Sequence, residues 1–141
     1  MTKRNLLATL LLLLFSGSIW AASTHDCGPY VLRHRVLAST NLSPASANLL
    51  GVEVSPSVGI INIMLLNKAS GKTLSGRVHV VIKRASGLMR ALKLRMIESE
   101  EESLFYAAEF QYAAGEKIDF ELSVSALGQP PQAFSFSQTL P

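Results

Sequence analysis

The sequence predicts an all-β protein, an immunoglobulin-like β-sandwich of seven or eight antiparallel strands with one short helix near residues 44–50. Three observations predict this fold. Apolar and polar residues alternate along several short segments, which is the pattern of strands with one buried face. Turn residues such as Gly, Pro, Asn and Ser separate these segments at short intervals. Only one short segment carries the signals that begin and end a helix.

The first predicted strand spans residues 30–39, because its apolar side chains alternate with arginines. A helix over residues 44–50 follows. Ser43 is a good N-cap, a proline occupies the first helical position, and Gly51 suits a left-handed end. The strand at residues 30–39 is expected to turn four side chains toward the core: Tyr30, Leu32, His34 and Val36.

The middle of the chain predicts four more strands. Residues 51–55 form a short strand that ends at Pro56, and residues 58–66 are nearly all apolar, as in a central strand buried on both faces. Residues 76–84 and 88–97 form a hairpin around the turn Arg-Ala-Ser-Gly. The second strand of this hairpin is expected to turn four side chains inward: Leu88, Leu92, Leu94 and Met96.

Three strands complete the predicted sandwich. The acidic segment 98–103 is interpreted as a solvated turn, and a strand over residues 104–110 follows it. Residues 117–124 alternate most regularly, and the last strand lies at 133–140. The predicted core contains nine of the side chains: Leu32, Val36, Ile61, Val80, Leu94, Tyr106, Phe120, Leu122 and Phe136.

The first residues have the anatomy of a secretory signal peptide. Two basic residues precede an apolar run over 6–15, and small residues follow as far as Ala22. We expect a signal peptide at residues 1–21, a single β-sandwich domain at 22–141, and a location in the periplasm. The apolar run is short for a membrane span. Loss of the two leader cations lowers the formal net charge from +3 to near +1, so the charge does not favour nucleic-acid binding.

Residues 23–28 place a histidine, an aspartate and the single cysteine just behind this leader. Cleavage after Ala22 would begin the mature chain with Ser-Thr-His, whose amine, backbone nitrogens and His25 imidazole can hold Cu(II) in a square plane. Cleavage after Ala21 is favoured, because the later cut has a bulky tryptophan three residues before it. The expected result is a frayed end in which Cys27 is an accessible thiol that can link two chains. The sequence predicts no metal site here, and His25 and Cys27 are the candidate ligands if a metal binds.

A basic surface is the second candidate site. Its members lie on the outward sides of the two hairpin strands: Arg77, His79, Lys83, Lys93 and Arg95. If these strands pair, the five form one cationic patch that can meet anionic lipid headgroups or an acidic partner. The alternative is an ordinary polar sheet face. His34, on the buried side of its strand, is interpreted as a core histidine with a hydrogen-bond partner.

The remaining motifs do not indicate catalysis. The sequence Ser-Gly-Lys-Thr at 70–73 lacks both the earlier glycine and the following helix of a phosphate-binding loop. We expect no enzymatic activity and no cofactor. The sequence predicts a non-catalytic binding or accessory module that contacts another envelope component, with a copper-handling protein as the alternative.

The chain also resembles a family of secreted bacterial proteins, the domain-of-unknown-function family 4426. The residues that carry the resemblance are Tyr30, Ser39 with Thr40, LSPASA at 42–47, Gly51 with Val52, IINI at 60–63, LFYAAEF at 104–110 and FSFSQ at 134–138. They are spread over nearly the whole chain behind the leader. The resemblance implies a periplasmic immunoglobulin-like β-sandwich, and it implies no activity.

Overall fold

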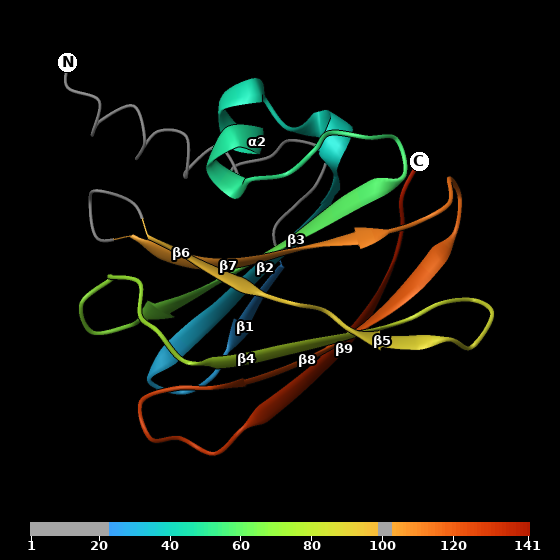
Figure 1. The fold of residues 1–141 in the computed structure, drawn as a ribbon. Helices are drawn as coiled ribbons and strands as arrows, with labels where there is room; N and C mark the ends of the chain where they lie inside the picture. Colours follow the sequence, from blue (N-terminus) through green and yellow to red (C-terminus); the bar gives the residue numbers. More distant parts are fainter. Residues whose placement is uncertain (1–22, 99–102) are drawn as a thin grey trace.

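The computed structural model describes residues 23–98 and 103–141, which form two antiparallel sheets that pack face to face (Figure 1). The five-stranded sheet has the order β1 (Ser23–Asp26), β2 (Tyr30–Ala38), β3 (Val58–Asn67), β7 (Leu104–Gln111), β6 (Arg95–Glu98). The four-stranded sheet has the order β5 (Met89–Ala91), β4 (Arg77–Lys83), β8 (Lys117–Ser125), β9 (Gln132–Thr139). The predicted all-β sandwich is confirmed, with nine strands in the described residues instead of seven or eight.

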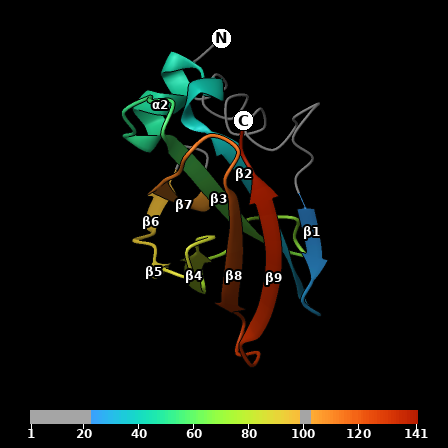
Figure 2. The same ribbon diagram turned by 90° about the vertical axis from the view of Figure 1, so that its right-hand side faces the viewer.

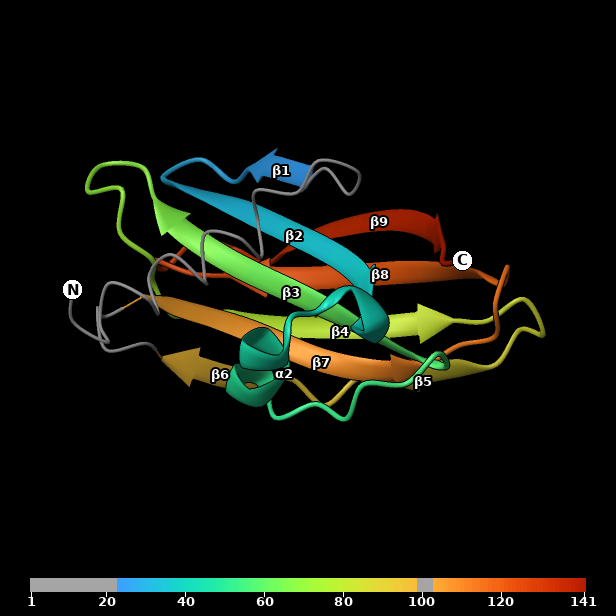
Figure 3. The same cartoon turned by 90° about the horizontal axis from the view of Figure 1, so that it is seen from above.

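The helix α2 (Pro44–Leu50) lies over the outer face of the five-stranded sheet (Figure 3). A short 3₁₀ turn, η1 (Ser39–Asn41), leads into it from β2. The Ser43 side chain accepts a hydrogen bond from the Ser46 backbone N–H at 3.1 Å, as an N-cap does. Gly51 ends the helix with a φ of 66°, in the left-handed region that glycine tolerates best. The predicted helix and both of its end signals are confirmed.

Strand β3 is buried on both of its faces, as its apolar sequence predicts. On one face Ile61 and Ile63 belong to the core between the two sheets. On the other face Ile60 and Met64 pack in a second cluster with Leu50 of α2. The helix is therefore the cover that lets a strand of a two-sheet protein be apolar throughout.

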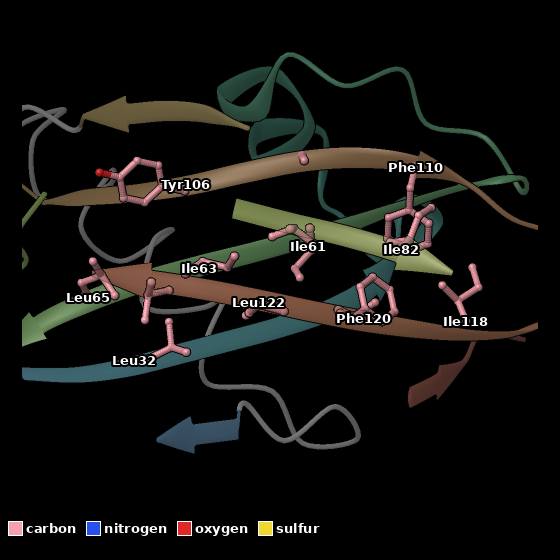
Figure 4. Close-up of a cluster of buried hydrophobic side chains, with 14 of the residues drawn as sticks. Leu32, Ile61, Ile63, Leu65, Ile82, Tyr106, Phe110, Ile118, Phe120 and Leu122 are labelled. Carbon is pink, nitrogen blue, oxygen red and sulfur yellow. The ribbon is translucent and has the colours of Figure 1, made fainter. Parts of the chain in front are cut away.

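The core between the sheets is one continuous cluster of side chains from both of them (Figure 4). Phe120 packs edge-on against Phe110 and stacks on Phe136, with ring centroids 5.4 and 4.9 Å apart. Of the predicted core residues, Leu94 and Phe136 are partly buried at the margin of this cluster, and the others are buried. The prediction of the core is therefore confirmed except at its margin.

The strand predicted over residues 88–97 is wrong, because this segment changes sheets. The hairpin from β4 to β5 forms as expected, but β6 pairs with β7 in the other sheet. Leu92 and Leu94 pack against the core between the two strands, while Leu88 and Met96 are 63% and 56% exposed. The alternation of side chains is interrupted at the crossing, so a single inward face over residues 88–97 does not exist. The short strand predicted at 51–55 is also absent.

Two predictions concern residues outside the described ones. These are the leader at 1–21, with its cleavage site, and most of the acidic turn at 98–103, of which 99–102 are not described. In the described part of the chain, none of the helices has the length and apolar character needed to cross a membrane.

Phe120 gives a direct test of the core. We expect Phe120→Ala to lower the free energy of unfolding by about 3–5 kcal/mol, because it leaves a cavity where two aromatic rings now pack. Lys117→Ala, at an exposed position of the same strand, should change it by less than about 0.5 kcal/mol. Urea denaturation followed by circular dichroism measures both, and equal effects would contradict the burial of Phe120.

Candidate functional site

The best candidate site is a cleft of about 860 Å³ beside β5 and β6. It arises where the chain crosses from one sheet to the other. Because β6 pairs only with residues 104–107 of β7, the rest of that strand has no neighbour on this side, and the crossing segment 92–94 bridges the opening. We call this opening the basic cleft, since four cations line it: Arg84, Arg90, Lys93 and Arg95.

Apolar side chains contribute the inner wall of the basic cleft. Ile82 and Phe110 line it and are both buried in the core. Arg90 lies directly opposite Ile82 in the β4–β5 pairing, so its side chain is on the same face of the sheet, toward the space between the sheets. Glu109 is the single acidic residue of the lining. The basic cleft thus combines an apolar interior with an excess of positive charge.

Arg84 is held in place by the protein itself. Its Nε and Nη2 donate to the two carboxylate oxygens of Glu116 at 3.1 and 2.6 Å, and its Nη1 donates to the Gln111 carbonyl at 2.8 Å. The backbone N–H of Ala113 and the Arg84 guanidinium lower the pKa of Glu116. The bidentate pair joins the residue after β4 to the residue before β8, and the bond to Gln111 joins it to the end of β7, so Arg84 shapes one side of the basic cleft.

The other cations differ in how far they are engaged. The Arg95 guanidinium donates to the carbonyl of Leu50, at the C-terminal end of α2, where a positive charge is favourable. Arg90 and Lys93 are exposed, and within residues 23–98 and 103–141 neither has an ion-pair partner. These two side chains are therefore the ones most available to an anionic ligand.

The predicted five-residue cationic patch does not form as one surface. Arg77, His79 and Lys83 are exposed on the outward face of β4, as expected, but Lys93 lies on the crossing segment and Arg95 on the other sheet. The pairing on which the patch depended was wrong, since β6 is the partner of β7. On the face of β4, Lys83 lies opposite the carboxylate of Asp119 on β8, which offsets its charge.

Sequence reasoning missed Arg84 and Arg90, which the fold brings to the basic cleft. A signal for them was present, because residues 83–95 contain five cations and no acidic residue. The prediction grouped cations by the face of the strand on which alternation placed them, so it did not treat these five as one basic segment. Because the chain changes sheets at residues 92–94, alternation does not say which of these side chains lie together. Their closeness in the sequence was the better guide to the basic cleft.

A second feature is a pair of histidines at the opposite edge of the sandwich. The expected frayed end is instead strand β1, which pairs with β2 and brings His25 to His34. Their Nε2 atoms are 3.0 Å apart while the ring centroids are 5.1 Å apart, so the rings meet edge to edge and share a hydrogen bond. Phe134 and Phe136 of β9 stack on them at 4.4 and 4.2 Å.

The histidine pair is a packed structural contact. His34 is 4% exposed, and its burial, followed by the charge of His25, lowers its pKa to about 4. The interpretation of His34 as a core histidine with a hydrogen-bond partner is therefore confirmed. In the described residues no three His, Cys, Asp or Glu side chains gather to form a possible metal site. In that part of the chain, the side chains therefore offer copper no cluster beyond these two imidazoles, which bind each other.

The prediction for Cys27 is wrong. Its side chain is 2% exposed and belongs to the core cluster, because the turn after β1 directs it inward and its backbone N–H bonds the Tyr30 carbonyl at 2.9 Å. Burial raises the pKa of the Cys27 thiol, which reduces the reactive thiolate. The structure therefore gives no support to a dimer linked through Cys27.

Asn62 is a polar residue that sequence reasoning passed over within the apolar run of β3. It is fully buried on the side of the sheet where α2 lies, and its amide atoms make no hydrogen bond with the described residues. Arg35 of β2, also buried, lies directly opposite it. An asparagine inside a strand buried on both faces was the available signal.

Comparisons with known proteins place these features in context. The family described as Domain of unknown function (DUF4426) matches the chain over residues 24–140. Among solved structures, the chain is similar to a DUF4426 family protein from Pseudomonas aeruginosa PAO1, with 27% sequence identity and a TM-score of 0.71. That match covers 84% of this chain and 93% of the other. None of the curated proteins matches the chain.

The low pKa of His34 predicts a dependence of stability on pH. Unfolded His34 has an ordinary pKa near 6.5, so below that pH the unfolded state binds a proton that the folded state refuses. We expect the free energy of unfolding to fall as the pH drops from 6.5 to 4, by up to about 3 kcal/mol from this group. Urea denaturation at a series of pH values measures this loss.

In the variant His34→Gln, the free energy of unfolding should fall less between pH 6.5 and 4 than in the unchanged protein, whatever the variant's stability at neutral pH. His79→Gln removes an exposed histidine of β4 and should leave the profile unchanged. A profile that keeps its slope in His34→Gln would contradict the assignment.

Cys27 gives an independent test of the docking of β1. We expect a thiol reagent such as dithionitrobenzoate to react slowly with the folded protein and rapidly in urea, because the thiol is buried and protonated. Rapid reaction under native conditions would show that the segment before β2 is not packed as described.

Proposed function

This chain belongs to the family described as Domain of unknown function (DUF4426), and we propose that it acts as a periplasmic, non-catalytic binding module. Its partner is an envelope component that presents anionic groups, such as carboxylates or phosphates, beside apolar surface. The basic cleft is the binding site, with Arg90 and Lys93 as the principal contacts. The two-sheet fold, of immunoglobulin-like type, acts as the rigid frame that presents the site.

One observation carries the proposal. Four cations from separate positions between Arg84 and Arg95 converge on a single opening whose inner wall is apolar. Arg84 is already paired with Glu116, so the uncompensated charge is that of Arg90, Lys93 and Arg95. Like charges brought together at one place cost free energy unless an anion is bound there, and converging cations of this kind are common in sites for anionic ligands. The volume of about 860 Å³ is in the range of ligand sites.

The composition of the lining supports a binding role in preference to catalysis. The residues that line the basic cleft include no serine, cysteine or histidine, so the lining offers no nucleophile beside a base. Glu109 is there without a second carboxylate to share acid and base roles.

The location rests on the N-terminal sequence. A basic start, an apolar run and small residues are typical of a cleaved signal peptide, and export would bring the basic cleft to the anionic groups of the envelope. N-terminal sequencing or intact mass of the protein recovered from the periplasm tests the cleavage.

Charge reversal tests the function of the basic cleft. We expect Arg90→Glu with Lys93→Glu to weaken binding to phosphatidylglycerol vesicles or to acidic envelope proteins by about tenfold or more. Binding of the unchanged protein should also fall as salt rises, since the attraction is screened. Cosedimentation with vesicles and affinity capture from an envelope fraction, each at low and high salt, measure the two kinds of partner.

The matched control reverses two cations on the outward face of β4. Arg77→Glu with Lys83→Glu makes the same change of net charge at exposed positions outside the basic cleft. Equal loss in both double variants would indicate a general charge effect, and binding that survives reversal of Arg90 and Lys93 would exclude the basic cleft as the site.

A further inference from the structure

Strand β9 forms an unprotected edge of the four-stranded sheet. Among residues 23–98 and 103–141 it pairs with β8 alone, and Figure 2 shows it as the last strand on its side of that sheet. The other three edge strands are only three or four residues long, and each carries at least one charged side chain: Asp26 in β1, Arg90 in β5, and Arg95 and Glu98 in β6. Short length and charge are the devices that keep sheet edges from pairing with other chains. Strand β9 has eight residues and uses neither device.

The sequence of β9 is close to a palindrome. It reads Gln-Ala-Phe-Ser-Phe-Ser-Gln over residues 132–138, with Ser135 at the centre. In an antiparallel pair about a two-fold axis, residues at equal distances before and after the centre lie opposite each other. A palindromic strand therefore sets each residue against its like when it pairs with its own copy.

We propose that two copies of this chain pair through β9, antiparallel, about a two-fold axis at Ser135. In this register Phe134 lies opposite Phe136 of the second copy, and Gln132 lies opposite Gln138. The single mismatch sets Ala133 against Ser137. Opposite residues share a face, so the exposed serines stay outward and the half-buried phenylalanines extend the apolar layer from one copy to the other.

Charge does not oppose this pairing. The strand carries no ionisable side chain. Two outward carboxylates of β8 lie beside β9: Glu121, which is opposite Ser135 at the axis, and Asp119, which accepts a hydrogen bond from the Ser137 hydroxyl at 2.5 Å and lies two residues farther along the strand. In the dimer the two copies of Glu121 are three strand spacings apart, about 14 Å, which exceeds the Debye length of about 8 Å at physiological salt. The dimer is therefore expected to be insensitive to salt, unlike binding at the basic cleft.

The size of the contact sets the expected affinity. One pair of eight-residue strands buries less than the roughly 1,200 Å² of a standard stable interface. We therefore expect a concentration-dependent dimer rather than a permanent one. Sedimentation equilibrium over a range of protein concentrations measures its dissociation constant.

The variant Ser135→Lys tests the register. It sets two ammonium groups directly against each other at the axis, on the exposed face, where the monomer tolerates lysine. We expect the dissociation constant of the dimer to rise by about tenfold or more, with unchanged circular dichroism. The control Ser86→Lys makes the same change in the β4–β5 turn, at the opposite edge of the same sheet, and should leave the dimer intact.

A crosslink supplies a second measurement. We expect Ser135→Cys to form a disulfide-linked dimer on mild oxidation, while the unchanged protein, whose only thiol is the buried Cys27, and Ser86→Cys do not. The proposal is overturned if the protein stays monomeric at its highest soluble concentration, or if Ser135→Lys leaves the dimer unaffected.

Discussion

The contact between the two sheets is the interaction on which the rest of this protein depends. The chain has a single cysteine, so no internal disulfide can hold the sheets together. Phe120 is central to their contact, since it packs against Phe110 of the opposite sheet and Phe136 of its own. The same demand for apolar burial accounts for α2, which covers the outer face of β3 and allows that strand to be apolar on both sides.

The space between the two sheets is closed by different means at its two sides. At one edge the segment 92–94 crosses between the sheets, which leaves part of β7 uncovered and creates the basic cleft. At the other edge two imidazoles in one layer stack on two phenyl rings in the other. A polypeptide crossing leaves room for a ligand, whereas stacked rings fill the space. The position of the candidate site follows from this difference.

Much of the fold was predictable because alternation reports burial directly. Strands β2, β3, β4, β7, β8 and β9 and both ends of α2 were identified from apolar spacing and capping residues. The crossing between β5 and β6 was not, because alternation indicates which face of a strand is buried and does not indicate which sheet the strand joins. For the same reason, Lys93 and Arg95 were wrongly predicted to share a surface with the outward side chains of β4. Strand β1 and the burial of Cys27 were missed because a four-residue strand is too short to show alternation, and because the turn that follows it is held partly by Gln132 of the distant strand β9.

The basic cleft and β9 lie at opposite edges of one sheet, whose order is β5-β4-β8-β9. A dimer joined through β9 therefore has an eight-stranded sheet with one basic cleft at each end, about 34 Å apart along the strand spacing. Such a particle is bivalent. On a surface that displays many anionic groups, the second cleft would bind at the high effective concentration set by the first, so weak individual contacts would give a long residence time. On a soluble partner with a single anionic segment, that gain in avidity would vanish.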